Sequence, residues 1–324
     1  MYPLGTDRPW PENQWYVAGF SNELGDAMVA RTFLGRRVVM FRDSMGEVRA
    51  LSGVCPHRMM PMEEGKLDGD RLACGYHGLA FDAHTGKCVA SPTSKRMPEC
   101  ALARYPLREF GPLLWIWMGD PDQAASTPLP PQESIGIGCE DWVTQCVDYQ
   151  LLKARYPLLI DNLFDLSHIY YIHYSIIGES GRSTLDEPVI KQRDGRLLVY
   201  REVMDVPKDH FDNYSFPGAG PRVSKRSETE LVNISLINAG TLAVEGPDWD
   251  SKHLGYLNFI HVLTPETETT THYWAMLTRD FRIDDKQYSD EMAKLEMSVI
   301  AQDREALEKI EVLLQSSEIG RAHV

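Results

Sequence analysis

The chain has 324 residues, of which 43% are hydrophobic and 25% are charged, and its formal net charge is −14 at pH 7. This length and composition indicate a globular protein of one large or two ordinary domains, and the acidic charge argues against nucleic acid or an anionic membrane as the main partner. The sequence has no apolar run of the roughly 18 to 20 residues that a membrane span needs and no secretory signal at its start, so we expect a cytoplasmic protein.

Short runs rich in β-forming residues occupy the first part of the chain. Residues 15–18, 36–41 and 48–51 contain Val, Trp, Tyr and Phe, and a turn signal, Asp-Ser-Met-Gly, lies at 43–46. Because turns rather than helical segments separate these runs, they predict a small antiparallel sheet.

Two boxes that each pair a cysteine with a histidine follow this sheet. Cys55 and His57 lie in Cys-Pro-His, and Cys74 and His77 lie in Cys-Gly-Tyr-His-Gly. A tetrahedral zinc site is chemically possible, but zinc fingers usually place their cysteines together and their histidines together. One Cys and one His per box fit a Rieske [2Fe–2S] cluster better, because one iron takes both thiolates and the other both imidazoles. We expect the four remaining cysteines to be small buried residues.

The composition then changes in a way that suggests a domain boundary. An aromatic strand is predicted up to residue 120, and residues 121–134 carry four prolines together with Ala, Ser and Thr, as linkers do. We therefore predict a first domain over residues 1–120, a linker over 121–134 and a second domain over 135–316. We interpret residues 317–324 as an artefactual tail on a truncated gene fragment.

The second domain contains two histidines five positions apart. His168 and His173 lie in residues 161–173 among Leu, Ile, Phe and Tyr. Five residues of a straight α-helix advance about 500°, so the two rings would point roughly 140° apart. They converge only if the helix ends, bends or bulges between them, as functional helices often do. The pair is therefore either two ordinary core residues or the protein half of a mononuclear metal site.

Strands are predicted for much of the rest of this domain. Runs at 142–147, 189–204 and 226–244 and a hairpin at 256–279 have β character. We expect residues 216–221, Phe-Pro-Gly-Ala-Gly-Pro, to form a flexible flap between two of these strands.

A long amphipathic helix is predicted for residues 286–315. Apolar residues recur in steps of three and four with one gap of seven, at Met292, Leu295, Val299, Ala306, Ile310 and Leu313. Asp303 lies in that gap, on the face that we expect to be buried. The other acidic residues of the helix lie off this stripe, where we expect solvated charge: Asp290, Glu291, Glu296, Glu305, Glu308 and Glu311.

A buried Asp303 needs a partner, because an unpaired buried carboxylate costs several kcal/mol. It is predicted either to pair with a buried Arg or His or to bind a metal. Together with His168 and His173 it would form a 2-His-1-carboxylate set, which holds non-haem Fe(II) and leaves one face open to O2 and substrate.

From about residue 15 to residue 315, the chain resembles the α-subunits of Rieske non-haem iron oxygenases, and more narrowly the vanillate O-demethylase and dicamba monooxygenase group. The motifs that carry the resemblance are Cys-Pro-His-Arg at 55–58, Cys-Gly-Tyr-His-Gly-Leu at 74–79, Trp-Ile-Trp at 115–117, Ile-Asp-Asn-Leu-Phe-Asp-Leu-Ser-His at 160–168 and Leu-Thr-Pro-Glu-Thr-Glu at 263–268. The resemblance implies an α+β protein. An all-β Rieske [2Fe–2S] domain would precede a helix-grip (START-like) domain, in which a curved antiparallel sheet wraps on a long helix.

The resemblance also implies an assembly. Members of the family form head-to-tail homotrimers, in which the cluster of one subunit supplies electrons to the mononuclear iron of its neighbour. Asp165 matches the bridging carboxylate, which would accept hydrogen bonds from His168 of its own chain and from His77 of the adjacent chain. Asn162 matches a position near the iron.

The implied function is that of the oxygenase component of a multicomponent monooxygenase. It would O-demethylate an aromatic methyl ether, such as a vanillate-like aromatic acid, with O2 and with electrons from NADH. A separate flavin and iron–sulfur reductase would deliver them, because no nicotinamide or flavin site is evident in the sequence. Asn233 and His261 match positions that contact an aromatic acid in the dicamba-degrading relative.

Two other kinds of function stay open at this point. Ring dihydroxylation or N-demethylation would use the same cofactors on another substrate. A Rieske electron-transfer protein fused to a ligand-binding module would use the cluster without oxygenation.

Overall fold

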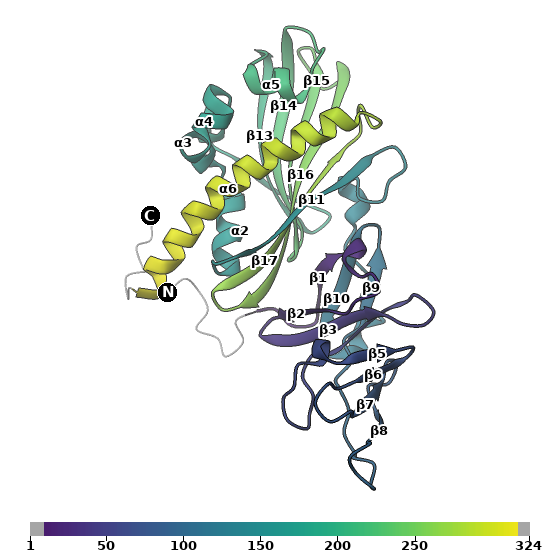
Figure 1. The fold of residues 1–324 in the computed structure, drawn as a ribbon. Helices are drawn as coiled ribbons and strands as arrows, with labels where there is room; N and C mark the ends of the chain where they lie inside the picture. Colours follow the sequence, from purple (N-terminus) through teal and green to yellow (C-terminus); the bar gives the residue numbers. More distant parts are fainter. Residues whose placement is uncertain (1–9, 317–324) are drawn as a thin grey trace. The chain divides into compact units, whose positions relative to one another are not determined.

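The structure, a computed structural model, describes residues 10–316, which divide into two compact units (Figure 1). One unit comprises residues 10–129 and 264–268, and the other comprises residues 130–263 and 269–316. Within the described range, none of the helices is both long enough and apolar enough to cross a membrane. The tail predicted at 317–324 lies outside the described residues.

The described strands of the first unit form three small antiparallel sheets, with the orders β1-β10-β9, β2-β3-β4 and β5-β6-β7-β8. Their bounds are β1 Gln14–Phe20, β2 Val29–Phe33, β3 Arg36–Arg42, β4 Val48–Ser52, β5 Lys66–Asp68, β6 Arg71–Ala73, β7 Ala80–Asp82, β8 Cys88–Ala90, β9 Leu107–Phe110 and β10 Leu113–Met118. Short helical turns are η1 Ser21–Glu23, η2 Met62–Glu64 and α1 Pro121–Ala124.

The core of the first unit lies where the sequence places aromatic and aliphatic residues. β10 is buried along its whole length, and Trp117 packs against Trp15 of β1 with 5.3 Å between ring centroids. Aromatic cross-strand pairs of this kind contribute about 0.2–1 kcal/mol each. A second buried cluster includes Cys55 and Cys74, so both cysteine loops rest on packed core. The other four cysteines are half-buried, not buried as expected.

The second unit is a seven-stranded antiparallel sheet with the order β11-β17-β16-β15-β14-β13-β12. The helix α6 (Lys286–Ser316) crosses this sheet in Figure 1. The strand bounds are β11 Val143–Leu152, β12 Val189–Arg193, β13 Arg196–Pro207, β14 Arg222–Asn233, β15 Leu236–Glu245, β16 Lys252–Thr267 and β17 Thr270–Arg279. The predicted fold class, an all-β domain followed by an antiparallel sheet on a long helix, is confirmed.

Shorter helical segments complete the second unit. They are η3 Gln132–Ile135, α2 Tyr156–Phe164, η4 Leu166–His168, α3 Ile169–Ile172, α4 Tyr174–Ile177, η5 Gly178–Leu185 and α5 His210–Ser215. Residues 216–221, in which a flexible flap was expected, directly follow α5 and form turns and bends. They begin with Phe216, which is buried in a cluster with Tyr288 and Met292 of α6. This aromatic contact anchors the segment to the core.

The buried face of α6 differs from the apolar stripe expected from the sequence. The fully buried positions include 288, 292, 296, 300, 303, 307 and 311, in steps of three and four. Ile310 and Leu313 are 43% and 65% exposed, whereas Glu296 and Glu311 are 2% and 1% exposed. The expectation that Asp303 is the one buried acid of this helix is therefore wrong, because two glutamates share its face.

Glu311 can be buried because Arg155 balances its charge. Arg155 donates from Nε to Glu311 Oε2 and from Nη2 to Oε1, both at 2.7 Å, and its main-chain N–H adds a third hydrogen bond at 3.1 Å. Paired donors of this kind satisfy a carboxylate away from water. An analysis of helix periodicity that counts only apolar residues does not identify Glu311 as a buried position.

We expect the Arg155→Met variant to be less stable than the wild type by about 3 kcal/mol, because Glu311 would be left buried without its charge partner. Urea unfolding followed by tryptophan fluorescence measures this difference. Lys309→Met is the control, since it breaks an exposed pair with Glu305 and should cost about 0.5 kcal/mol or less. Equal stability of the two variants would contradict the role given to the buried pair.

Candidate metal centres

The two Cys–His boxes of the first unit lie in compact turns of similar construction. In each turn two main-chain hydrogen bonds of 2.8–3.0 Å close the loop. The carbonyl of Cys55 accepts from the N–H of Met59, and the N–H of Cys55 donates to the carbonyl of Met60. The same two bonds join Cys74 to Gly78 and to Leu79. Met59 and Gly78 both have positive φ, 58° and 70°, a conformation that glycine adopts without steric cost. The second turn therefore uses the residue that the geometry favours.

The cysteines and the histidines of the two boxes differ in solvent exposure. The thiols of Cys55 and Cys74 are buried, whereas the rings of His57 and His77 are exposed or partly exposed, with 4.7 Å between their centroids. Burial is the main cause that raises the pKa of the Cys55 thiol, while the main-chain N–H of His57 acts in the opposite direction and favours the thiolate. Two thiols inside and two imidazoles outside fit the donor set of a Rieske cluster.

The helix that carries the second pair of histidines is broken, as their spacing requires. α2 ends at Phe164, the short turn η4 ends at His168, and His173 separates α3 from α4. These breaks turn the rings toward each other, with 5.2 Å between their centroids. The prediction that the helix is interrupted between the two histidines is confirmed.

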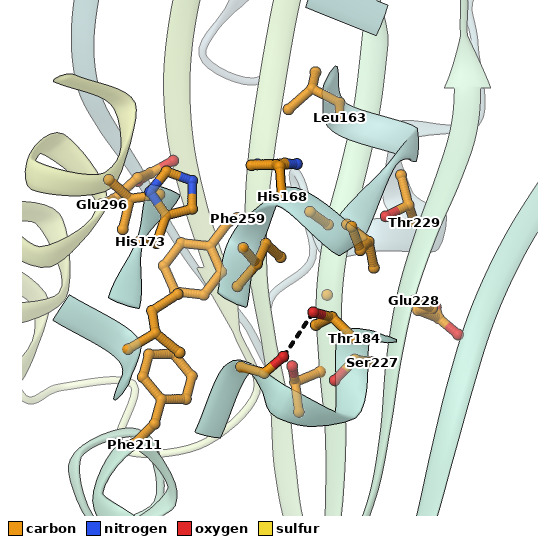
Figure 2. Close-up of a pocket in the computed structure, with 18 of the residues that line it drawn as sticks. Leu163, His168, His173, Thr184, Phe211, Ser227, Glu228, Thr229, Phe259 and Glu296 are labelled. Atoms are coloured by element: carbon orange, nitrogen blue, oxygen red, sulfur yellow. Dashed lines mark hydrogen bonds between the residues drawn. The ribbon is translucent and has the colours of Figure 1, made fainter. Parts of the chain in front are cut away.

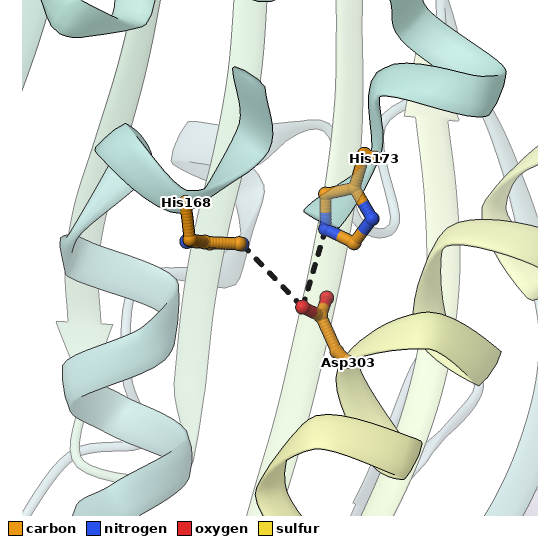
Figure 3. Close-up of side chains that lie close together, drawn as sticks. All are labelled: His168, His173 and Asp303. Atoms are coloured by element: carbon orange, nitrogen blue, oxygen red, sulfur yellow. Dashed lines mark ion pairs between the residues drawn. The ribbon is translucent and has the colours of Figure 1, made fainter. Parts of the chain in front are cut away.

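Asp303 of α6 meets both rings (Figure 3). Its Oδ1 atom lies 3.4 Å from His168 Nε2 and 3.2 Å from His173 Nε2, and one ligand atom from each of the three residues lies within 4.8 Å of the others. His173 is 1% and Asp303 8% exposed. The His173 Nε2 atom is buried and lacks a hydrogen bond of good geometry, which is the expected state of a nitrogen whose partner is a metal ion. The donor set therefore fits non-haem Fe(II).

The opposite nitrogen of each ring is held by a protein group. His173 Nδ1 lies 2.9 Å from Gln302 Oε1, and Gln302 Nε2 donates to Ser175 Oγ at 2.9 Å. His168 Nδ1 contacts the main-chain oxygen of Asp165. Such partners orient metal-binding imidazoles, because an N–H that donates to them leaves Nε2 free of a proton. Gln302 was not identified from the sequence, although it directly precedes Asp303.

The charges of the three residues depend on one another. Burial alone would raise the pKa of Asp303, but the interactions with His168 and His173 hold that pKa below its ordinary range. Burial alone would lower the pKa of His168, but Asp303 and, to a smaller extent, Asp165 outweigh burial and raise this pKa above its ordinary value. The carboxylate is therefore ionised in this site, as a metal ligand must be.

Asn162 and Asp165 flank this site. Asn162 Nδ2 donates to Asp303 Oδ1 at 3.2 Å. The Asp165 carboxylate accepts from the N–H and the hydroxyl of Ser167, and so it caps the turn η4. The hydrogen bond expected between the Asp165 carboxylate and His168 is made by the Asp165 main-chain oxygen instead.

A cavity of about 180 Å³ adjoins the three residues. It is lined by residues of α6, of the interrupted helix α2 to α4, of η5 and α5, and of the strands β14 to β16. Its walls are mostly apolar, and Figure 2 shows the rings of Phe211 and Phe259 among its lining. A mostly apolar pocket with a few polar groups is typical of sites for small organic molecules.

The two predicted substrate contacts differ in position. His261 lines the cavity and is 8% exposed, its Nδ1 lies 2.5 Å from Tyr273 Oη, and burial lowers its pKa to about 4, so the ring is neutral. Asn233 is not among the lining residues. It ends β14, where its Oδ1 accepts from the N–H of Ser235. The expectation for Asn233 is therefore corrected, because its amide stabilises a turn.

A Rieske-type donor set in one unit and a 2-His-1-carboxylate site beside an apolar cavity in the other define the class of Rieske non-haem iron oxygenases. Comparison with known proteins agrees with this class. Residues 14–106 match the Rieske [2Fe-2S] domain, and residues 152–321 match the vanillate O-demethylase oxygenase C-terminal domain.

Individual relatives match most of the chain. It is 33% identical to the putative toluene-4-sulfonate monooxygenase system iron-sulfur subunit TsaM2 of Comamonas testosteroni, over 94% of this chain and 88% of the relative. It is 31% identical to the dicamba O-demethylase oxygenase component of Stenotrophomonas maltophilia, over 92% of this chain and 87% of the relative. The crystal structure of dicamba monooxygenase bound to 3,6 dichlorosalicylic acid superposes with a TM-score of 0.81 at 27% identity, covering 97% of this chain and 92% of that one.

The chain belongs to the Rieske non-haem iron oxygenases, in the group with a vanillate O-demethylase type of C-terminal domain. It is the oxygenase component of a Rieske monooxygenase, with a [2Fe–2S] cluster and a mononuclear iron as cofactors. The predicted family, enzyme class and cofactors are confirmed.

We expect Asp303→Ala to lose the mononuclear iron and to keep the cluster, because the carboxylate lies beside His168 and His173 and not beside the Cys–His boxes. Iron content should fall from about three to about two atoms per chain, with the Rieske absorbance and electron paramagnetic resonance signals unchanged. Asp290→Ala, on an exposed position of the same helix, is the control. An Asp303→Ala protein that keeps about three iron atoms per chain would disprove the ligand role.

We expect Gln302→Leu to bind the mononuclear iron about 10- to 100-fold more weakly, because His173 loses the acceptor that orients its ring. The rate at which a chromophoric Fe(II) chelator removes this iron measures the change. Gln302→Glu keeps an acceptor oxygen and should release iron at close to the wild-type rate. If the Leu variant also retains iron as the wild type does, the glutamine does not position His173.

Proposed function

We propose that this chain O-demethylates an aromatic methyl ether, with O2 and with electrons from a separate reductase. The observation that carries the proposal is the position of the 2-His-1-carboxylate residues at the wall of an apolar cavity of about 180 Å³. Apolar cavities of about 150 Å³ are large enough to bind benzene. The match of residues 152–321 to the vanillate O-demethylase C-terminal domain supports the same reaction.

The roles of the site residues are part of this proposal. The Rieske cluster would be held by two thiolates and two imidazoles, from Cys55, Cys74, His57 and His77. The mononuclear iron would be held by His168, His173 and Asp303. When bound, these groups supply reductive activation of O2, with electrons that reach the iron one at a time.

The overall reaction balances with two electrons and two protons. One atom of O2 enters a C–H bond of the methoxy group, and the other atom leaves as water. The hemiacetal that results breaks its bond between the methyl carbon and the ether oxygen, which releases formaldehyde and a phenol. Detection of formaldehyde therefore distinguishes O-demethylation from ring hydroxylation.

The side chains around the iron ligands position the reactants. The Asn162 amide holds the Asp303 carboxylate in place through their hydrogen bond. The neutral His261 ring, oriented by Tyr273, offers a polar contact within the cavity. The apolar side chains of the wall exclude water, which strengthens both polar interactions.

We also propose a homotrimer in which His77 of one chain meets Asp165 of the next. Exposure of the residues concerned supports this arrangement. His57 and Asp165 are exposed, and Tyr76, which lies beside His77, is 58% exposed. The electron donor would be a flavin and iron–sulfur NADH reductase, and the net charge of −14 favours a basic docking surface on that partner.

The test is a panel of methoxyarenes offered to the wild-type protein with a surrogate reductase, NADH and O2. We expect at least one of them to give formaldehyde and phenol in equal amounts, with one O2 consumed for each. Asp303→Ala, incubated with the same panel, is the control and should give no formaldehyde.

Two other outcomes would replace the proposal. Hydroxylated product without formaldehyde, across the panel, would indicate ring hydroxylation. A cluster that is reduced and reoxidised without substrate-dependent O2 uptake would indicate an electron carrier with a ligand-binding module.

A further inference from the structure

Glu296 lines the cavity and has no function in the site described so far. It lies on the buried face of α6, is 2% exposed, and neither of its carboxyl oxygens has a hydrogen-bond partner among the described residues. Figure 2 shows its side chain beside the cavity, on the side formed by α6. A buried polar group without a partner is rare in native proteins and calls for a ligand or another explanation.

Glu296 contrasts with the two other buried acids on the same face. Asp303 has the two histidines and Glu311 has Arg155, whereas no Lys, Arg or His within residues 10–316 donates to the Glu296 carboxyl group. An isolated carboxylate costs too much to bury and takes up a proton instead. Burial accordingly raises the pKa of Glu296 well above its ordinary value. In this state the group offers one O–H donor and one carbonyl acceptor.

The charged groups of the cavity wall are already paired. Lys225 is the one Lys or Arg among the described lining residues, and its Nζ atom lies 3.1 Å from Asp209 Oδ2 and 2.7 Å from Asp212 Oδ1. Glu228 pairs with Arg193 at 3.1 Å. These lining residues therefore offer no unpaired cation for an anionic substrate.

The charges also balance when iron is bound. Lys225 with its two carboxylates carries one net negative charge. Fe(II) with two neutral imidazoles and one carboxylate carries one net positive charge, which offsets it. An anionic substrate would add a buried charge without compensation, and such a charge is costly. A neutral substrate adds none.

The spacing along α6 suits a substituted benzene ring. Glu296 precedes Asp303 by seven residues, which is two helix turns or about 10 Å on the same face. A ring that points its methoxy group at the iron ligands would direct a substituent at its opposite end toward Glu296. Phe211 and Phe259 supply aromatic surface for the ring itself.

We propose that Glu296 is a specificity-determining residue, whose carboxylic acid group hydrogen-bonds to an uncharged carbonyl or amide group of the substrate. The cavity then selects neutral aryl methyl ethers, such as aromatic carboxamides, over the aromatic acids that the sequence led us to expect. This inference rests on the proposed O-demethylation and adds the chemical class of the substrate.

The experiment compares two probes of equal size, 4-methoxybenzamide and 4-methoxybenzoate, on the iron-loaded full chain. Equilibrium dialysis gives the two Kd values, and formaldehyde production gives turnover. We expect the amide to bind at least about tenfold more tightly than the benzoate, a difference of about 1.4 kcal/mol. Difference infrared spectra should show the carbonyl stretch of a protonated carboxylic acid, which shifts when the amide binds.

Variants of Glu296 distinguish the effect of its hydrogen bond on amide binding from the effect of its side-chain volume. Glu296→Leu should weaken amide binding about tenfold, because the amide loses its partner in an apolar setting. Glu296→Gln keeps a donor and an acceptor, so it should retain amide affinity within about threefold and lose the infrared band. Glu305→Leu, at an exposed position of the same helix, should match the wild type in both measurements.

The outcomes distinguish this inference from the proposed reaction. Amide binding that depends on Glu296, without formaldehyde from any methoxyarene, would overturn O-demethylation and leave the binding role intact. The inference is overturned if the amide does not bind, binds no better than the benzoate, or binds Glu296→Leu as it binds the wild type. If the Leu variant does not fold, the selectivity of the wild type and the infrared band in wild type and Glu296→Gln decide the question.

Discussion

The attraction between one carboxylate and two imidazoles holds the catalytic unit in its working form. Asp303 lies 141 residues after Asn162, its hydrogen-bond partner in the broken helix, so this contact joins the end of the chain to the start of the second unit. Each imidazole is held through its far nitrogen, one by Gln302 and the other by a main-chain oxygen. The near nitrogens consequently converge on Asp303, and a metal ion needs little rearrangement to bind there.

The long helix α6 illustrates how environment decides the state of an acidic residue. Its buried face carries Glu296, Asp303 and Glu311, each exposed by less than a tenth. Arg155 balances the charge of Glu311, the histidines hold Asp303 ionised, and burial without a partner keeps Glu296 neutral. One helix face thus provides a structural ion pair, a candidate metal ligand and a neutral buried carboxylic acid.

The geometry of the two Cys–His loops depends on residues that are close in sequence. Each is closed by main-chain hydrogen bonds within a few residues of its cysteine, and buried core supports both thiols. Because this geometry depends on near neighbours in the chain, a short motif is enough to specify it. The mononuclear site, by contrast, requires the sheet to bring α6 against a distant segment.

The sequence by itself identified the candidate donor residues of both metal sites and the need for a break between His168 and His173. Cysteine and histidine spacing in a loop, and the angular advance of a helix, are local quantities that the chain order contains. Only the tertiary structure decided which acids of α6 are buried, that Asn233 stabilises a turn and that Gln302 orients His173. The reason is that burial of a polar side chain depends on its partner, and such a partner, as Arg155 is for Glu311, can lie anywhere in the chain.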